Sequence, residues 1–149
     1  MVRLPLVVLV LGLASCTTSG PLAEPPAGFL VLERDEAGYR ATTADGARLF
    51  IRSFPDPNDG ELAFWADALE HDFTRNRGYE LVAREAVHDS DGEVGDSQHY
   101  RTVHDGTPHD YLVVIFDRGS TIRILEFTAD HETFETHVAA VRAALPKLR

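Results

Sequence analysis

Histidines and carboxylates are concentrated between residues 88 and 110. This stretch contains four of the seven histidines and six acidic residues. Imidazole nitrogens and carboxylate oxygens are ligands that Zn²⁺ and Cu²⁺ accept in proteins, so this stretch is the first candidate for chemistry. Its members are His88, Asp89, Asp91, Glu93, Asp96, His99, His104, Asp105, His109 and Asp110.

His104 and His109 lie on either side of a predicted four-residue turn. The flanking segments predict a hairpin, in which the two imidazoles can approach each other across the strands. With Asp105 or Asp110 they would form a ligand set, which suggests a small metal-binding protein or metal-assisted hydrolase using the region of His99, His104 and His109. The spacing matches no defined zinc signature, and such residues at strand ends are usually solvated. We therefore expect no metal or other cofactor.

The remaining sequence shows no catalytic motif. Nucleophilic catalysis needs an activated Ser, Thr or Cys, but no serine lies in a nucleophile-elbow pattern. Ser120 falls in a predicted turn, where its hydroxyl would bond the local backbone. The acidic segment 89–93 has glycine at the fourth position, not at the sixth as in an EF-hand loop. We expect a protein that is not an enzyme.

The N-terminus has the pattern of a secretion signal. Arg3 precedes an apolar run from Leu4 to Leu13, which is followed by small residues and Cys16. The run has about ten residues, whereas a helix needs about twenty to span a bilayer, so it predicts a cleaved signal peptide over residues 1–15. Cys16 is the only cysteine and has no disulfide partner within the chain.

The tetrapeptide Leu13-Ala14-Ser15-Cys16 resembles the lipobox of bacterial lipoproteins. This resemblance implies a diacylglycerol thioether on Cys16, cleavage before Cys16 and a further acyl chain on the new amino group. The next residue is Thr17 rather than aspartate, which implies an outer-membrane lipoprotein facing the periplasm. The alternative is an ordinary signal peptide with a chance cysteine near its cleavage site.

Composition and charge exclude several partners and folds. The chain has 149 residues, of which 44% are hydrophobic and 26% charged, a composition typical of one globular domain. Its formal charge is −10 and its basic residues are scattered, which argues against nucleic acid as a partner. Residues 16–28 are rich in proline and glycine and predict a lipidated N-terminus with a flexible tether, or alternatively an arm lying on the domain. The globular domain is expected over residues 29–149.

The hydrophobic periodicity predicts a mixture of strands and helices. Asp59 is expected to cap the first helix and Asp130 the last. Trp65 lies at helical spacing among apolar residues, which indicates core packing rather than a binding role. The predicted strands are 29–33, 39–43, 48–54, 79–87, 98–104, 111–116 and 121–127, with an acidic loop at 88–96, and the predicted helices are 61–76 and 130–145.

This order of elements resembles the Mog1/PsbP-type α+β domain, an antiparallel sheet covered by a helix on each face. The stretch from Tyr111 to Leu145 carries most of the resemblance, because its two strands are apolar on both faces and the final helix is amphipathic. The resemblance implies a non-enzymatic accessory or binding module, although one fold hosts many functions. We expect a lipid-anchored envelope protein that binds another envelope protein; the third hypothesis is a purely structural cap on a larger assembly.

Overall fold

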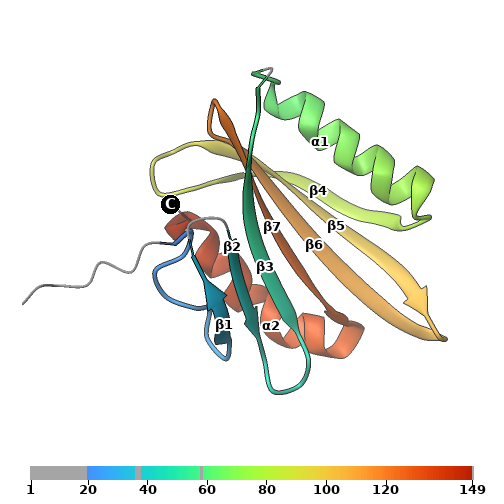
Figure 1. Ribbon diagram of the computed structural model, residues 1–149. Helices are drawn as coiled ribbons and strands as arrows, with labels where there is room; N and C mark the ends of the chain where they lie inside the picture. Colours follow the sequence, from blue (N-terminus) through green and yellow to red (C-terminus); the bar gives the residue numbers. More distant parts are fainter. Residues whose placement is uncertain (1–19, 36–37, 58, 149) are drawn as a thin grey trace, which may run out of the picture.

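The protein is a seven-stranded antiparallel sheet with a helix on each face (Figure 1). A computed structural model describes residues 20–35, 38–57 and 59–148, so the predicted signal peptide and Cys16 lie outside the described residues. The strand order is β1-β2-β3-β7-β6-β5-β4. The strands are β1 (Leu30–Arg34), β2 (Gly38–Thr42), β3 (Arg48–Pro55), β4 (Glu80–His88), β5 (Val94–His104), β6 (Thr107–Asp117) and β7 (Thr121–Asp130); the helices are α1 (Leu62–His71) and α2 (His131–Ala144).

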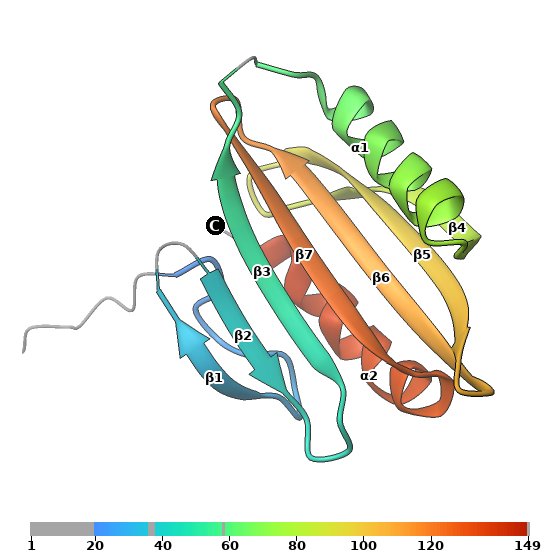
Figure 2. The ribbon, with the colours of Figure 1, turned by 45° about the vertical axis from the view of Figure 1, so that its right-hand side comes forward.

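The two helices cover opposite faces of this sheet (Figure 2). Helix α1 packs on β5 and β6, and α2 packs on β6 and β7, so the predicted α+β architecture is confirmed. The run from Leu112 to Phe116 on β6 is buried on both faces, because α1 covers one face of this strand and α2 the other. None of the helices in the described ranges is long and apolar enough to cross a membrane.

The core beneath α2 contains the larger of two apolar clusters. Phe127 and Phe134 are fully buried there, with ring centroids 4.9 Å apart, and Phe29 meets Phe127 edge-on at 6.0 Å. Val141 and Leu145 continue the buried side of α2, as its spacing predicts. Removal of this apolar surface from water holds α2 on the sheet.

A second apolar cluster lies beneath α1. Phe73 is buried and stacks on Tyr100, with ring centroids 4.6 Å apart. Leu62, Trp65 and Leu69 are partly buried against this cluster, which places Trp65 in the packing layer as its spacing predicts. Helix α1 continues into a π-helical turn, Asp72–Asn76, that brings Phe73 over the sheet.

The start of α1 differs from the prediction. Asp59 does not cap the helix, because the N-cap residue is Glu61, which makes no side-chain capping bond. Asp56 lies before the helix and accepts hydrogen bonds from the Gly60 amide at 2.7 Å and the Trp65 indole at 2.9 Å. The carboxylate of Asp56 therefore provides a hydrogen-bond acceptor for a backbone amide just before α1, and it fixes the position of the Trp65 indole.

Two loops are shorter than the sequence predicts. Strand β5 begins at Val94, paired with His88, so only residues 89–93 remain as loop. Asp105 and Gly106 form a two-residue turn with φ values of 49° and 79°, in place of the predicted four-residue turn. Positive φ at both central positions is the requirement of a type I′ hairpin, which Asp-Gly meets well.

Residues 20–28 lie against the domain. Leu22 is fully buried and forms an isolated β-bridge with Leu148. Gly28, with φ of 86°, directs the chain into Phe29, and a β-carbon there would contact the His137 ring. This part of the predicted tether thus fits the alternative of an N-terminal arm.

Arg84 on β4 links the sheet edge to α1. Its guanidinium lies 2.8 Å from Asp96 on β5 and 2.9 Å and 2.8 Å from Asp67 and Glu70 on α1. A network of four charges contributes more than isolated surface pairs do. We expect Arg84→Ala to lower the free energy of unfolding by about 1–2 kcal/mol, measured by urea denaturation.

Arg75→Ala is the matched control for Arg84, because Arg75 is exposed on the adjacent π-helical turn and has no ion pair within the described part of the chain. Equal unfolding midpoints for the two variants would contradict the assigned role of Arg84.

Candidate functional site

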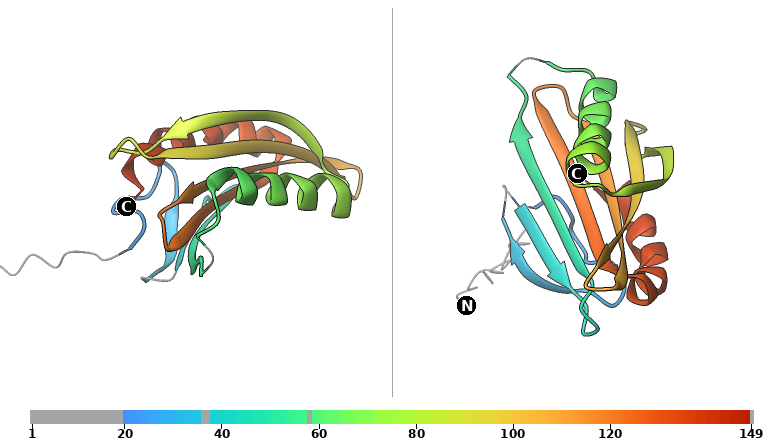
Figure 3. Two further views of the ribbon diagram at one scale, coloured as in Figure 1. Left: turned by 90° about the horizontal axis from the view of Figure 1, so that it is seen from above. Right: turned by 90° about the vertical axis from the view of Figure 1, so that its right-hand side faces the viewer.

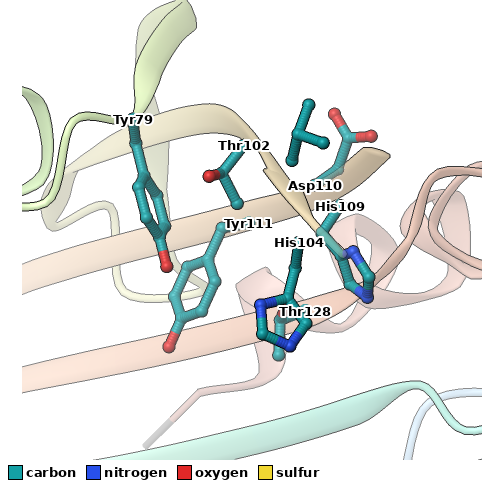
Figure 4. A pocket seen from close by; sticks show the side chains of 8 residues that line it. Tyr79, Thr102, His104, His109, Asp110, Tyr111 and Thr128 are labelled. Carbon is teal, nitrogen blue, oxygen red and sulfur yellow. The ribbon is translucent and has the colours of Figure 1, made fainter. Parts of the chain in front are cut away.

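His104 and His109 lie together beside the β5–β6 turn (Figure 4). Their ring centroids are 6.0 Å apart and nearly perpendicular. Nδ1 of His109 lies 3.1 Å from the Thr107 carbonyl oxygen, and Nε2 of His104 lies 3.4 Å from a carboxylate oxygen of Asp105. The side chains of His104 and Asp105 are more than three-quarters exposed. The pair of histidines therefore lies at the solvent-exposed end of the β5–β6 hairpin.

His99 and Asp110 do not join this pair, which corrects the proposed histidine site. Side chains alternate between the two faces of a strand, so His99 and Asp110 face α2 whereas His104 and His109 face the α1 side. The His99 ring stacks on Phe134 of α2 at 4.9 Å. Within the described ranges, no three His, Cys, Asp or Glu side chains are grouped so as to hold a metal ion.

Asp110 is instead the centre of a buried polar cluster. Its carboxylate is fully buried and accepts hydrogen bonds from three side chains, two on β5 and one at the start of α2. One oxygen lies 2.6 Å from Nε2 of His99 and 2.9 Å from Arg101, and the other lies 2.7 Å from Nδ1 of His131. Because His131 is the first residue of α2, the cluster joins this helix to β5 and β6.

The electrostatics of Asp110 favour its charged form. Burial raises the pKa of this carboxyl group, but hydrogen bonds from His131, Arg101 and His99 outweigh burial and place its pKa below the ordinary value. Both oxygens are already occupied by these donors. The cluster therefore orients side chains at the start of α2 and offers no free carboxylate for catalysis.

Helix α1 covers only part of its face of the sheet, because it packs on β5 and β6. Strands β1, β2, β3 and β7 present one bare face next to α1 (Figure 2). A hollow of about 450 Å³ lies on this face, lined from Leu32 on β1 to Tyr111 on β6. A smaller hollow of about 290 Å³ continues past Tyr111 to His104 and His109 (Figure 4). The two hollows share Tyr111 and Thr128, and we refer to them together as the groove.

Phe50 is the phenylalanine among the residues that line the larger hollow. Arg40 on β2 and Arg52 on β3 place their guanidinium carbons 5.3 Å and 5.9 Å from the centre of the Phe50 ring. Arg48 lies two residues before Phe50 on the same face of β3 and is exposed. Such guanidinium groups can stack on the aromatic face while keeping their donors free for an anion. We call Arg40, Arg48, Phe50 and Arg52 the arginine patch.

Glu126 is the acidic residue among those lining the larger hollow. Its carboxylate lies 3.5 Å from Arg52 and accepts a hydrogen bond from the Tyr111 hydroxyl at 3.4 Å. Burial, followed by the nearby negative charge of Glu126, raises the pKa of Tyr111 to about 12. Tyr111 therefore remains protonated at neutral pH and can donate a hydrogen bond.

Comparison with known proteins assigns the fold. No family model and no curated protein matches the sequence. The Ran-binding protein Mog1p of Saccharomyces cerevisiae is 11% identical, with a TM-score of 0.58 over 83% of this chain and 84% of that chain. PsbP from the cyanobacterium Synechocystis is 16% identical, with a TM-score of 0.55 over 81% and 80%. The fold is Mog1/PsbP-like.

The Mog1/PsbP-like fold also occurs in a protein of cell envelope biogenesis. LpqN of Mycobacterium tuberculosis, which is involved in cell envelope biogenesis, is 13% identical, with a TM-score of 0.59 over 85% of this chain and 79% of that chain. At these identities the similarity defines the fold alone, and residue roles must come from this chain.

Sequence reasoning missed two groups that the fold assembles. The arginine patch needs Arg40 and Phe50 on neighbouring strands, in the register that pairs these two residues. The alternation of Arg48 and Arg52 with apolar residues already indicates one polar face of this strand. No local signal links Asp110 to His131, because they are 21 positions apart and meet only when α2 docks.

Proposed function

We propose that this chain is a bacterial envelope lipoprotein whose Mog1/PsbP-like domain is a binding module rather than an enzyme. Residues 1–15 act as the signal peptide and Cys16 carries the lipid. The protein faces the periplasm from the outer membrane, and its partner is another envelope protein. The observation that carries the proposal is the lipobox-like tetrapeptide ending at Cys16, which lies directly before the folded domain.

The position of the folded domain supports this arrangement. The described fold begins at Gly20, so cleavage before Cys16 removes none of the described residues. Three residues lie between Cys16 and Gly20, and the four Cα–Cα steps that they define span at most about 14 Å when fully extended. With each buried lipid methylene worth about 0.8 kcal/mol, two or more acyl chains anchor such a domain stably next to the bilayer.

The fold and its surface support the binding role. Among solved neighbours, Mog1p is a Ran-binding protein and LpqN takes part in cell envelope biogenesis, so this fold serves in binding and envelope roles elsewhere. In this chain, the groove on the bare sheet face supplies a surface with both aromatic and charged groups. Aromatic and arginine side chains are the types most enriched where proteins bind each other.

The test combines intact mass with membrane fractionation in a bacterium that processes lipoproteins. The mature wild-type chain is expected to begin at Cys16, to carry at least two acyl chains and to remain in the outer-membrane fraction. Cys16→Ser is expected to abolish lipid attachment and processing before residue 16. Thr17→Ser, which keeps the lipobox, is the control, and Thr17→Asp is expected to shift the protein to the inner membrane.

A mature wild-type N-terminus at another residue, without lipid, would exclude the lipoprotein proposal. Outer-membrane recovery of Thr17→Asp at the wild-type level would contradict only the proposed sorting by residue 17.

A further inference from the structure

The arginine patch combines three positive charges around one aromatic ring. Arg48 and Arg52 extend from the same face of β3, four residues apart, which separates them by about 13 Å along the strand. Arg40 projects from β2 beside Phe50, between them. Phe50 is half-buried, and the guanidinium groups of Arg40 and Arg52 lie over its ring, so the part of the ring that remains exposed borders these charges. The patch therefore presents cationic, aromatic and cationic groups in alternation.

The charge of the patch is opposite to that of the whole protein. The chain carries 24 acidic and 14 basic residues, yet the larger hollow is lined by Arg40 and Arg48 and by the single carboxylate of Glu126. Arg48 forms no ion pair with any residue that the structure describes. Arg40 pairs only loosely with Glu33 at 3.6 Å, with both side chains more than half exposed. These guanidinium groups thus retain most of their capacity to bind carboxylates.

The shape of this face favours an extended chain as the occupant. Strands β1, β2 and β3 extend the sheet beyond α1 (Figures 2 and 3). The larger hollow lies over these strands and β7, and the smaller hollow continues past Tyr111 on β6. A compact ligand would remain largely exposed, whereas small-molecule sites normally enclose most of the ligand. A peptide strand is narrow enough to enter and long enough to follow the groove.

We propose that the arginine patch binds an extended acidic segment of the protein partner. Carboxylates at positions i and i+4 of the segment would pair with Arg48 and Arg52, because these positions lie on one face about 13 Å apart. Arg52 already lies 3.5 Å from Glu126 and would bind its carboxylate with the remaining guanidinium donors. An apolar side chain at i+2 would rest on Phe50, and Arg40 would contact either carboxylate. This inference rests on the proposed binding function and specifies the site and the chemistry of the partner.

A peptide titration tests the recognition directly. The probe is a fluorescein-labelled nine-residue peptide with Glu, Leu and Glu at alternate central positions and Ser elsewhere; a second peptide has Gln in place of both Glu. By fluorescence anisotropy with the full chain in detergent, we expect the Glu peptide to bind at least about tenfold more tightly than the Gln peptide. Its affinity should fall with added salt because the contacts are exposed charge pairs.

Variants of the patch complete the titration. Arg48→Gln and the double variant Arg40→Gln with Arg48→Gln should weaken binding of the Glu peptide by about tenfold or more. Arg75→Gln is the matched control, because Arg75 is also exposed and lies on the π-helical turn after α1, outside the arginine patch. Circular dichroism checks that each variant remains folded. Equal binding of the Glu and Gln peptides, or equal effects of Arg48→Gln and Arg75→Gln, would overturn the inference.

Photo-crosslinking in cells separates this inference from the proposed function. Phe50 and Phe64 are each replaced by p-benzoylphenylalanine; Phe64 is the control because it is 62% exposed on α1. Support consists of a protein adduct at residue 50 that maps to an acidic peptide, is absent at residue 64 and is lost with Arg48→Gln.

The other crosslinking outcomes each exclude something definite. A protein adduct only at residue 64, or at residue 50 to a segment without carboxylates, overturns the inference and leaves the proposed binding function intact. A lipid adduct at residue 50 also overturns it and assigns the patch to the membrane. No protein adduct at either position contradicts both the binding function and the inference.

Discussion

Asp110→Ala is expected to lower the free energy of unfolding by about 3 kcal/mol or more, because it removes a fully buried carboxylate that three donors share. The change leaves the partly buried His99 and Arg101 without their acceptor at the junction of the sheet with α2. Denaturant titration monitored by circular dichroism measures the loss. Asp110→Asn keeps the shape of the side chain and should lower the free energy of unfolding by less than Asp110→Ala does.

Asp91→Ala is the control for this change, because Asp91 is exposed in the loop before β5. Its free energy of unfolding should stay within about 0.5 kcal/mol of the wild-type value. If Asp110→Ala were as stable as this control, the polar cluster would not be what holds α2 at its first turn.

The effect of Asp110 should also depend on pH. Its pKa in the folded protein lies below the ordinary value of 3.8, so the folded state favours the carboxylate more than the unfolded state does. This contribution is fully present above about pH 4 and is lost as pH falls through the lowered pKa. The stability difference between wild type and Asp110→Asn should therefore narrow when the pH is lowered from neutral to below about 4. A difference that grows on acidification would contradict this sign.

Phe127→Ala is expected to lower the free energy of unfolding by about 3–5 kcal/mol. The ring is fully buried between Phe29 and Phe134, so its removal loses apolar burial and leaves a cavity that the rigid sheet cannot close. Phe64→Ala makes the same chemical change at an exposed position and should cost no more than about 0.5 kcal/mol. Urea denaturation compares the two variants, and similar losses for both would contradict the assigned core.

Local sequence patterns predicted most of the secondary structure. Leu62, Trp65, Leu69 and Phe73 recur at helical spacing and all pack beneath α1. The apolar run from Leu112 to Phe116 lies in a central strand, as continuous apolarity on both faces requires. These predictions held because helix and strand periodicity depend on neighbours within a few residues.

The predictions that were wrong concern residues whose local sequence pattern is compatible with more than one structure. Asp59 follows the pattern of a helix cap, but Asp56 binds both the Gly60 amide and the Trp65 indole, which only the folded helix brings within reach. Asp105-Gly106 was predicted as part of a longer turn because Thr107 and Pro108 also resemble turn residues. In the fold both extend β6, since they pair with His104 and Val103 across the hairpin.

The amino-acid sequence by itself determined the order of strands and helices, their buried faces, and the lipobox-like leader on which the anchoring proposal depends. Only the tertiary structure decided which side chains share a site. The register of β2 against β3 brings Arg40 to Phe50, and the docking of α2 brings His131 to Asp110. The same alternation that defines a strand sends His99 and His104 to opposite faces. Strand order and register arise from contacts between distant segments, and local periodicity does not specify them.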